Sequence, residues 1–511
     1  MDSKTFERQD LPTTPTIMME SSTHLHHSDS LHSSPWQIHI IGDAYMDLFC
    51  FLQDALPKPG GDARLVQPIQ QFVGGSAVNT ATHLQAYLKR AALEHHTAEL
   101  SENGCCWNDQ TIPSVCLHTA INETDAYGQA MRQHAQEQGF QLMNCYEPTN
   151  DKESSLATGH CVCIVTQGDR SFLTHQGCMG TFSAQDVNQL WFSPNVSSMM
   201  HVSSNSTPQQ PHQPHQHPIP YTHIHIAGYY NMEGFHNGSL QQTLESILGQ
   251  RQDQSMETTV SLVTQYDATE TWDAGIREVF SWLDFLIVNE LEATQLVQRH
   301  ALSSSKDSTT TSTPLVEEIH VLQQQQSSSK EDGSDSTNNT STEKWVDLWK
   351  RGFAEWNMNT TGSSSSSPSF STVVVVTMGP QGAVALAEGR IVAQVSPAVT
   401  VERVVDPTGA GDAFAAGFVQ GLWHWRRRKQ IQKQQNGDRE ARLFADLSSS
   451  EGNDDETTKS TKRNSCQWPV EAILEGLHWG CAMGTSAVTI AGASVPASME
   501  SIHQLYNQQK Q

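Results

Sequence analysis

The sequence predicts an α/β protein with a central, mostly parallel sheet flanked by helices, and with a small antiparallel β lid. Apolar runs such as IHIIG at 38–42 and FLIVN at 285–289 are followed by helical patterns. Strands covered on both faces of a parallel sheet read as continuous apolar runs, and they alternate with the covering helices. Two alternating strands around Gln167-Gly168-Asp169 predict a hairpin at 158–175, and an antiparallel hairpin beside a parallel sheet suggests a lid. Further apolar runs lie at 223–228, 260–265 and 373–379.

The folded part is expected to be shorter than the 511-residue chain. Only 37% of the residues are hydrophobic, and long tracts consist of Ser, Gln, His and Thr. Tracts without apolar periodicity cannot offset the entropy cost of ordering, so we expect them to be disordered. We therefore predict a disordered tail at 1–34 and one globular domain at 35–511, with low-complexity insertions at about 94–112, 197–220, 300–345, 357–371 and 428–466.

A His-rich run, HQPHQHP at 212–218, lies inside one of these tracts. Imidazole is a common ligand of transition metals, so the run could bind a metal ion. It has no supporting cysteine or carboxylate, and the surrounding Pro and Gln residues favour low-complexity filler.

Charge and hydropathy exclude two classes of partner. The formal net charge of −25 would repel nucleic acid and anionic lipid. No apolar run approaches the roughly 20 residues of a membrane span. The ten cysteines form no CxxC pair, and the N-terminus lacks the apolar core of a signal peptide. We expect reduced thiols and a cytoplasmic location.

The stretch VVDPTGAGDAFAAGF at 404–418 places three small residues before an aspartate and an apolar helical pattern. The Gly409-Ala410-Gly411 turn would therefore lie where a helix begins. The first N–H groups of a helix have no internal partner, and they form an anion site that bare glycine backbone can bring close to a phosphate. Asp412 beside that site could be a general base or only a helix cap.

Two segments near the N-terminus carry polar groups at element ends. Asp47 is expected just past a strand, where open α/β sheets bind ligands, although a solvated turn aspartate fits equally well. Gly74 and Gly75 permit close backbone approach, and Asn79 follows on a starting helix with a donor and an acceptor. The alternative for this second segment is a helix cap after a tight turn.

Two later segments follow apolar strands. Asn289 and Glu292 are three residues apart, so both can face one side of a starting helix. Oxygen ligands at this spacing suit Mg²⁺ held partly through water, and capping is the alternative. The TMGPQGA turn at 377–383 could cradle a nucleotide or be a hairpin bend.

The order of these segments resembles the PfkB family, the ribokinase-like sugar and nucleoside kinases. The Gly-Gly turn with Asn four residues later and the DPTGAGD segment at 406–412 match the two signatures of the family. NELE at 289–292 and TMGPQG at 377–382 occupy the expected places between them. The resemblance spans about 38–502 apart from the insertions, and the chain has neither a GxxxxGK[ST] loop nor protein-kinase signatures.

The resemblance implies a ribokinase-like kinase domain that uses ATP, Mg²⁺ and K⁺. Asp412 would be the base that activates a substrate hydroxyl, and the N–H groups of Gly409, Ala410 and Gly411 would form the anion hole. The other implied sites are Asp47, Gly74, Gly75 and Asn79 for the acceptor, Asn289, Thr377, Gly379 and Gly382 for ATP, Asn289 and Glu292 for Mg²⁺, and Asp406, Thr408, Gly492 and Ser494 for a monovalent cation.

The acceptor stays open at this point. Tyr45 stands where ribokinase-like sugar sites often have a smaller polar residue, and GGSAVN is neither the GGKGAN nor the GGAPAN pattern. The expected function is phosphorylation of a hydroxyl on a sugar or sugar-like substrate. A nucleoside kinase and a non-catalytic scaffold protein are the alternatives, and a homodimer through the lid is a further expectation.

Overall fold

The structure of the chain is a computed structural model. It describes residues 36–53, 56–98, 112–148, 155–166, 169–191, 221–249, 257–304, 315, 317–319, 321–323, 338–360, 372–396, 401, 403–447, 468–490 and 492–510. The predicted tail at 1–34 and the predicted insertion at 197–220 lie outside these residues, so their disorder stays a prediction.

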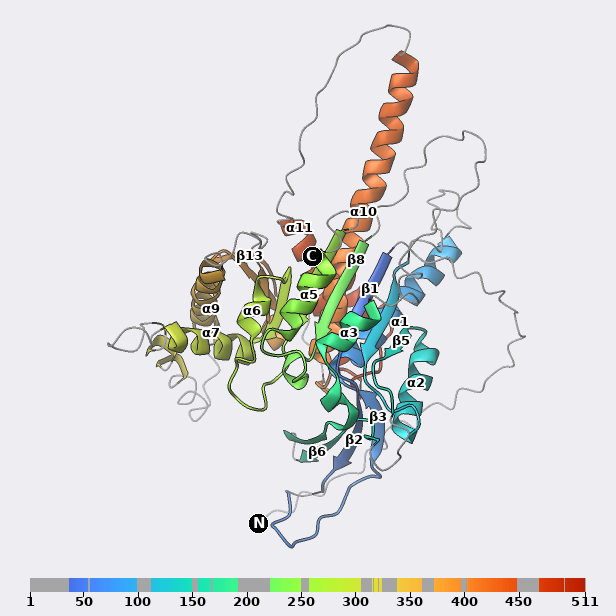
Figure 1. Cartoon of the computed structure of the whole chain (residues 1–511). Coiled ribbons are helices and arrows are strands. Elements are labelled where there is room, and N and C mark those ends of the chain that lie inside the picture. Colours follow the sequence, from blue (N-terminus) through green and yellow to red (C-terminus); the bar gives the residue numbers. More distant parts are fainter. Residues whose placement is uncertain are drawn as a thin grey trace, which may run out of the picture. The chain divides into compact units, whose positions relative to one another are not determined.

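The predicted parallel strands form one nine-stranded sheet, in the order β13-β12-β11-β10-β9-β8-β1-β4-β5 (Figure 1). Neighbouring strands from β11 to β5 run parallel, and β12 and β13 continue the sheet antiparallel at one edge. The fold class is therefore confirmed. The strands are β1 (Trp36–Gly42), β4 (Ser114–Thr119), β5 (Gln141–Asn144), β8 (Tyr221–Ala227), β9 (Glu257–Val263), β10 (Phe285–Asn289), β11 (Val373–Thr377), β12 (Ala383–Ala387) and β13 (Arg390–Val395).

Helices cover both faces of this sheet because its strands are apolar on both sides. Ile38 and Ile40 of β1 pack in one core with residues of α1 and α10, whereas Ile41 packs in another with residues of α3 and α5. The first layer contains α1 (Ser76–Ala98), α2 (Ala126–Gln138), α10 (Ala410–Leu447), α11 (Val470–Ala487) and α12 (Met499–Gln509), and the second contains α3 (Ala184–Trp191), α5 (Ser239–Gly249), α6 (Ile276–Phe280), α7 (Glu290–Ser304) and α9 (Asn338–Thr360).

The strand order reverses between β1 and β8, and this reversal positions the site. From β1 the chain proceeds to β4 and β5 on one side, and then to β8, β9, β10 and β11 on the other. Open α/β sheets bind ligands at such a switch point, outside the carboxyl ends of the strands. The functional groups should therefore follow the last residues of β1, β8, β9 and β10.

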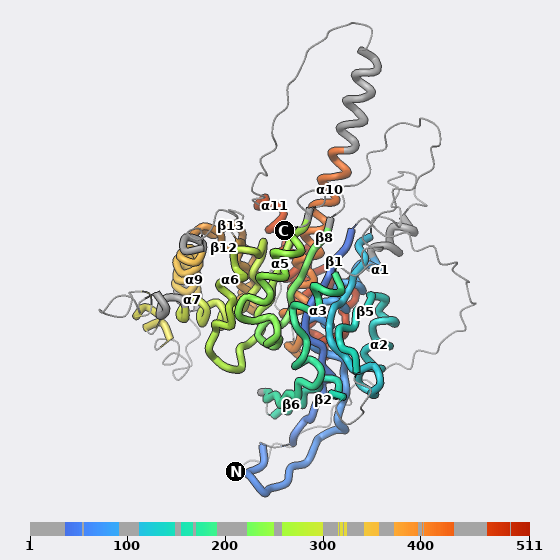
Figure 2. Tube along the Cα trace, in the orientation of Figure 1, coloured from blue at the N-terminus to red at the C-terminus, as the bar shows by residue number. Residues whose placement is uncertain are grey.

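The predicted lid hairpin belongs to a second sheet of four strands, β3 (Gln70–Gly74), β2 (Tyr45–Phe51), β6 (His160–Thr166) and β7 (Asp169–His175). The hairpin pairing of β6 with β7 is antiparallel as predicted, and so is that of β2 with β3. The pairing of β2 with β6 is parallel, so the small sheet is mixed. Figures 1 and 2 show β2 and β6 beyond the ends of β1 and β8.

Five helix ends, including that of α7 at Ser304, extend into tracts that we predicted to be loops. α1 continues to Ala98, α9 runs from Asn338 to Thr360, and α10 continues to Leu447. Adding residues to an existing helix needs no new nucleus, and these segments contain Arg, Lys, Gln, Glu and Ala, which favour helix even when the segment is polar.

Within the described ranges, no helix has the length and apolar character needed to cross a membrane.

Candidate active site

The Gly409-Ala410-Gly411 turn forms the start of α10, as predicted. Gly409 has a φ of +76°, and a Cβ there would lie 2.7 Å from the Cβ of Ala493. The backbone therefore requires glycine at this position. A Cβ on Gly411 would meet no atom within 4 Å, so this second glycine borders open space.

The N–H groups of this turn are only partly used by the protein itself. The N–H of Ala413 closes the first helical bond with the carbonyl of Gly409 at 2.8 Å, and the N–H of Ala410 donates to the carbonyl of Pro407 at 3.3 Å. Within the described residues, no hydrogen bond occupies the N–H of Gly411 or Asp412. Free N–H groups beside open space at a helix start are suited to an anion.

The carboxylate of Asp412 lies in the first turn of α10, and three side chains hold it. Its Oδ1 accepts from Ser76 Oγ at 2.6 Å and from Gln265 Nε2 at 3.1 Å. Its Oδ2 accepts from Asn79 Nδ2 at 2.8 Å. No hydrogen bond among the described residues joins this carboxylate to a backbone N–H of α10, so the capping interpretation of Asp412 has no support in its contacts.

Three buried or partly buried aspartates share this site. Burial raises the pKa of Asp412 to about 7, although the hydrogen bonds from Ser76 and Asn79 oppose the shift. Burial, with added repulsion from Asp43 and Asp412, raises the pKa of Asp47 to about 7, and burial raises that of Asp43 to about 6. A carboxylate that titrates near neutral pH can take up a proton during a reaction.

Asp47 lies within β2, not just past a strand as we predicted. The residue that follows β1 is Asp43, because only Asp43 and Ala44 separate β1 from β2. Asp43 accepts from Asn231 Nδ2 at 2.7 Å and from the N–H of Ala77 at 3.3 Å. The carboxylate of Asp47 accepts no hydrogen bond from the described residues and is only partly buried, so it is available to a ligand.

The Gly-Gly turn lets β3 and α1 approach the end of β1. A Cβ on Gly74 would lie 2.0 Å from Oδ2 of Asp47, and one on Gly75 would lie 2.6 Å from the carbonyl oxygen of Asp43. Gly75 also has a φ of +95°. Both glycines are therefore needed for the two aspartates to stand beside the start of α1, where Asn79 meets Asp412.

Asn289 and Glu292 form a capping box at the start of α7. The N–H of Glu292 donates to Asn289 Oδ1 at 2.9 Å, and the N–H of Asn289 donates to Glu292 Oε2 at 3.1 Å. Asn289 Nδ2 and Thr264 Oγ1 also donate to this carboxylate, at 2.8 Å and 3.0 Å. The capping alternative is therefore realised, and Mg²⁺ could meet these oxygens only in addition to those bonds.

The TMGPQGA segment is the bend of the β11–β12 hairpin, so the second alternative for its shape is realised. A short 3-10 helix, Gly379–Gln381, fills the bend, and Gly379 and Gly382 have φ values of +50° and +93°. Thr377 pairs with Asn289 across β10 and β11, which places the bend next to the start of α7.

Two of the four predicted cation residues, Asp406 and Thr408, contact Arg170. Asp406 Oδ1 accepts from Arg170 at 3.0 Å and from Thr408 Oγ1 at 2.6 Å, and its Oδ2 accepts from the N–H of Gly492 at 3.1 Å. Arg170 also contacts the hydroxyl of Thr408. The hydroxyl of Ser494 donates to the carbonyl of Val73 instead.

One part of the chain matches the model of a known protein family. Residues 364–445, which include β11, β12, β13 and the start of α10, match the family model of the pfkB family carbohydrate kinases. The predicted resemblance to the PfkB family is confirmed. The match covers only this C-terminal part of the chain and leaves the acceptor open.

Solved structures align with most of this chain at low sequence identity. A ribokinase from Giardia lamblia aligns with a TM-score of 0.54 and 16% sequence identity, over 92% of this chain and 99% of that chain. An adenosine kinase from Anopheles gambiae aligns with a TM-score of 0.48 and 12% identity, over 91% and 99% of the two chains. A search of curated protein sequences finds no match.

Four residues of this PfkB-like site were not predicted from the sequence. Ser76 could have been found, because it is the first residue of α1 directly after the Gly-Gly turn. Asp43 could also have been found, because it directly follows an apolar strand. Arg170 and Gln265 carried no usable signal, because each reaches its aspartate across an interval of more than 140 residues.

Proposed function

We propose that this chain catalyses ATP-dependent phosphorylation of a hydroxyl group on a small sugar or sugar-like substrate. The observation that carries the proposal is the carboxylate of Asp412, held by Ser76, Asn79 and Gln265 beside the open space at Gly411. This carboxylate would take the proton of the attacking hydroxyl, while the neighbouring N–H groups stabilise charge on the transferring phosphoryl group.

The acceptor is proposed to bind between Asp412 and Asp47. A buried carboxylate normally finds hydrogen-bond donors, yet Asp47 has none among the described residues. Hydroxyl groups of the substrate would donate these hydrogen bonds. They would also offset the free energy that it costs to hold three aspartates close together. Gly74, Gly75 and Asn79 shape the wall beside this acceptor site, which suits a compact molecule with several hydroxyl groups.

The nucleotide is proposed to lie along the ends of β10 and β11, against Thr377, Gly379 and Gly382. Its phosphates would then point toward the N–H groups of Gly411 and Asp412. Glu292 would hold Mg²⁺ through water, with Asn289, because its oxygens already accept three side-chain or backbone donors. When bound, Mg²⁺ would neutralise charge on the phosphates.

The residues expected to bind a monovalent cation fit one poorly. The guanidinium of Arg170 already pairs with Asp406, and Ser494 bonds Val73. We therefore assign K⁺ no part in the proposed reaction. Arg170 comes from β7, so this ion pair links the small sheet to the segment before α10, consistent with a proposed lid at 158–175.

A nucleoside kinase is the alternative within the same chemistry, because a ribose also offers hydroxyl groups to Asp47. A scaffold protein without catalysis is the alternative from another class. The burial of Asp412 argues against the scaffold, because burial disfavours the charged carboxylate and such perturbed groups are concentrated at functional sites.

The test is to incubate the purified full chain with ATP and Mg²⁺ and with separate panels of pentoses, hexoses, polyols and nucleosides. We expect transfer of phosphate to a sugar or polyol, and transfer slower by about 10² to 10⁴ with Asp412→Asn. Transfer only to nucleosides would establish the alternative acceptor. Tight ATP binding without transfer to any member of the panels would overturn the catalytic proposal in favour of a binding protein.

A further inference from the structure

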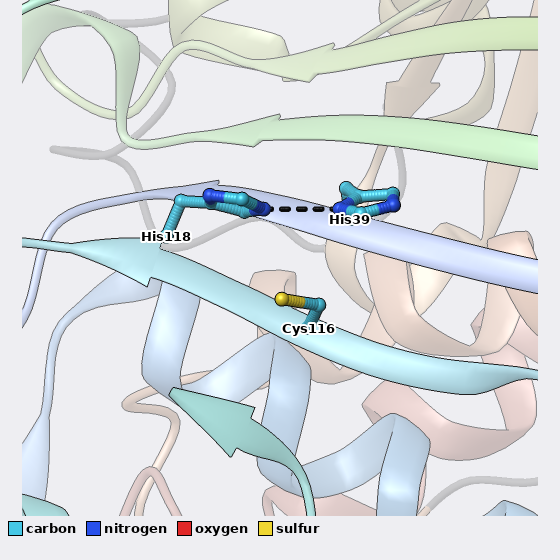
Figure 3. A group of neighbouring side chains, drawn as sticks. All are labelled: His39, Cys116 and His118. Atoms are coloured by element: carbon cyan, nitrogen blue, oxygen red, sulfur yellow. Dashed lines mark hydrogen bonds between the residues drawn. The ribbon is translucent and has the colours of Figure 1, made fainter. Parts of the chain in front are cut away.

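A second group of titratable side chains lies in the large sheet, away from the start of α10. His39 on β1 stands opposite Cys116 on the parallel strand β4, and Ile41 stands opposite His118. All three side chains, His39, Cys116 and His118, are buried (Figure 3). Residues two apart on a strand share a face, so the three lie on the face of Ile41, which is covered by α3.

The distances within this group are those of a metal site. His39 Nδ1 and His118 Nε2 are 3.0 Å apart, and one ligand atom from each residue, including Cys116 Sγ, lies within 4.8 Å of the other two. Nitrogen and sulfur ligands of a tetrahedral zinc ion are about 3.3 to 3.6 Å apart, given bond lengths of about 2.0 to 2.3 Å. Small side-chain rotations would bring all three atoms to those distances.

The protonation of the group also suits a metal ion. Gln37 Oε1 lies 3.2 Å from His39 Nε2 and is an acceptor, which assigns the proton of His39 to Nε2. His39 Nδ1 then accepts from His118 Nε2, and His118 Nδ1 is left without a partner among the described residues although it is buried.

Hydrogen bonding inside the group explains less than a metal ion does. The hydrogen bond between the two imidazoles occupies His39 Nδ1 and His118 Nε2, the atoms that a metal ion would bind, and it gives the third buried member of the group, Cys116, no partner. The thiol of Cys116 contributes no hydrogen bond among the described residues. The ring of Trp191 lies 4.5 Å from that of His39 and 6.2 Å from that of His118, measured between centroids, and shields the group.

We propose that His39, Cys116 and His118 bind one thiophilic transition-metal ion, with Zn²⁺ as the physiological candidate. The ion would take the place of the proton that His118 Nε2 donates to His39 Nδ1, that proton would move to His118 Nδ1, and His39 would keep its own proton on Nε2. Cys116 would lose its thiol proton to solvent as the metal–sulfur bond forms, with no change of oxidation state. Three protein ligands leave one position of a tetrahedral ion for water.

Such an ion would join β1 to β4 behind the candidate active site. His39 lies four residues before Asp43, so the ion would fix the strand that ends at the aspartate cluster. The expected role is structural, and it is independent of phosphate transfer.

The test uses Co²⁺ as a spectroscopic substitute for Zn²⁺ on the full chain after removal of metal by a chelator. We expect one Co²⁺ per chain to give a thiolate-to-cobalt charge-transfer band, and one Zn²⁺ to abolish it. Cys116→Ser should lose the band, and His118→Gln should weaken Zn²⁺ binding at least about tenfold. Cys145→Ser is the matched control, because this thiol follows the neighbouring strand β5, outside the group, and should keep the band.

The His-rich run at 212–218 could bind metal without a thiolate, so total metal content alone is not decisive. Absence of the charge-transfer band in the folded wild-type chain would overturn the proposal, and so would a band that survives in Cys116→Ser. If Cys116→Ser fails to fold, His39→Gln replaces it. Loss of the Zn²⁺-dependent rise in melting temperature in that variant then supports the site, and its retention overturns it.

Discussion

Among the helices that carry an acidic residue in the first turn, α7 and α10 use it differently. At α7, Glu292 accepts from the backbone and side chain of Asn289 and satisfies its own helix. At α10, Asp412 accepts only from side chains of other elements, Ser76, Asn79 and Gln265. The carboxylate of α7 stabilises the helix that carries it, whereas that of α10 is held for another purpose.

The comparison shows that a helix-start carboxylate is not functional by position alone. Both residues are buried, and burial raises both carboxyl pKa values. What separates them is the identity of the donors, because a cap is bonded by N–H groups of its own first turn. The start of α10 also keeps free N–H groups beside the open space at Gly411. These N–H groups are the second difference between the two helix starts.

The largest effect is expected from Asp412→Asn. The amide keeps the size of the side chain but cannot take up a proton, so transfer should fall by about 10² to 10⁴. The melting temperature should stay the same or rise, because a buried carboxylate with a raised pKa destabilises the folded state. Turnover and thermal unfolding are measured on one preparation. Wild-type turnover with a lower melting temperature would make Asp412 a cap like Glu292.

Gly411→Ala should reduce transfer by roughly tenfold to a hundredfold, if a phosphoryl group occupies the open space there. Stability should not fall, since alanine favours a helix more than glycine does and meets no protein atom. Gly409→Ala is the matched control. It should lower the free energy of unfolding by about 1 to 3 kcal/mol, because it forces alanine to a positive φ. Normal turnover in folded Gly411→Ala would contradict the anion site.

The pH dependence of turnover should show an acidic limb near the pKa of Asp412, about 7. Activity rises through this limb as the base loses its proton. The free energy of unfolding changes with pH in the opposite sense. Asp412 makes its full contribution to this free energy below its unfolded pKa, near 3.8, and the contribution is lost as the pH rises toward about 7. In Asp43→Asn the limb should move to lower pH, because Asp43 raises the pKa of Asp412. A limb that does not move would exclude this coupling.

The smallest effect is expected at α7. Asn289→Ala removes the cap and should lower the free energy of unfolding by about 1 kcal/mol. Under the proposed role of Glu292, Glu292→Gln should also raise the Mg²⁺ concentration required for half-maximal transfer. A stability loss with an unchanged Mg²⁺ requirement would leave α7 with a capping function alone.

The sequence predicts the elements of this fold better than the contacts between them. Continuous apolar runs identify β1, β8, β10 and β11 because both faces of the large sheet are covered. Asp47 was misplaced because a connection of two residues, Asp43 and Ala44, leaves no turn signal between β1 and β2. Helix ends were misplaced because polar residues with high helix propensity have the same composition as polar loops.

The candidate site could be predicted where its residues stand beside glycines, as Asp412 and Asn79 do. Gln265 could not, because it has a φ of +63° and meets Asp412 only through the tertiary fold. Arg170 likewise reaches Asp406 from a strand of the small sheet. Such contacts depend on how the sheets are placed, which no local pattern encodes.

The two-residue connection between β1 and β2 would be the pivot if the small sheet rotated against the large one. Asp43 at the pivot is fixed by Asn231 and Ala77, which belong to the large-sheet layer. Asp47 lies four residues further along, at the end of a lever arm of about 13 Å. A turn of about 10° at the pivot would move its carboxylate by about 2 Å relative to Asp412, which is anchored on α10. The distance between the carboxylates of Asp47 and Asp412 would therefore depend on the angle between the two sheets. A substrate of the wrong length would strain β2.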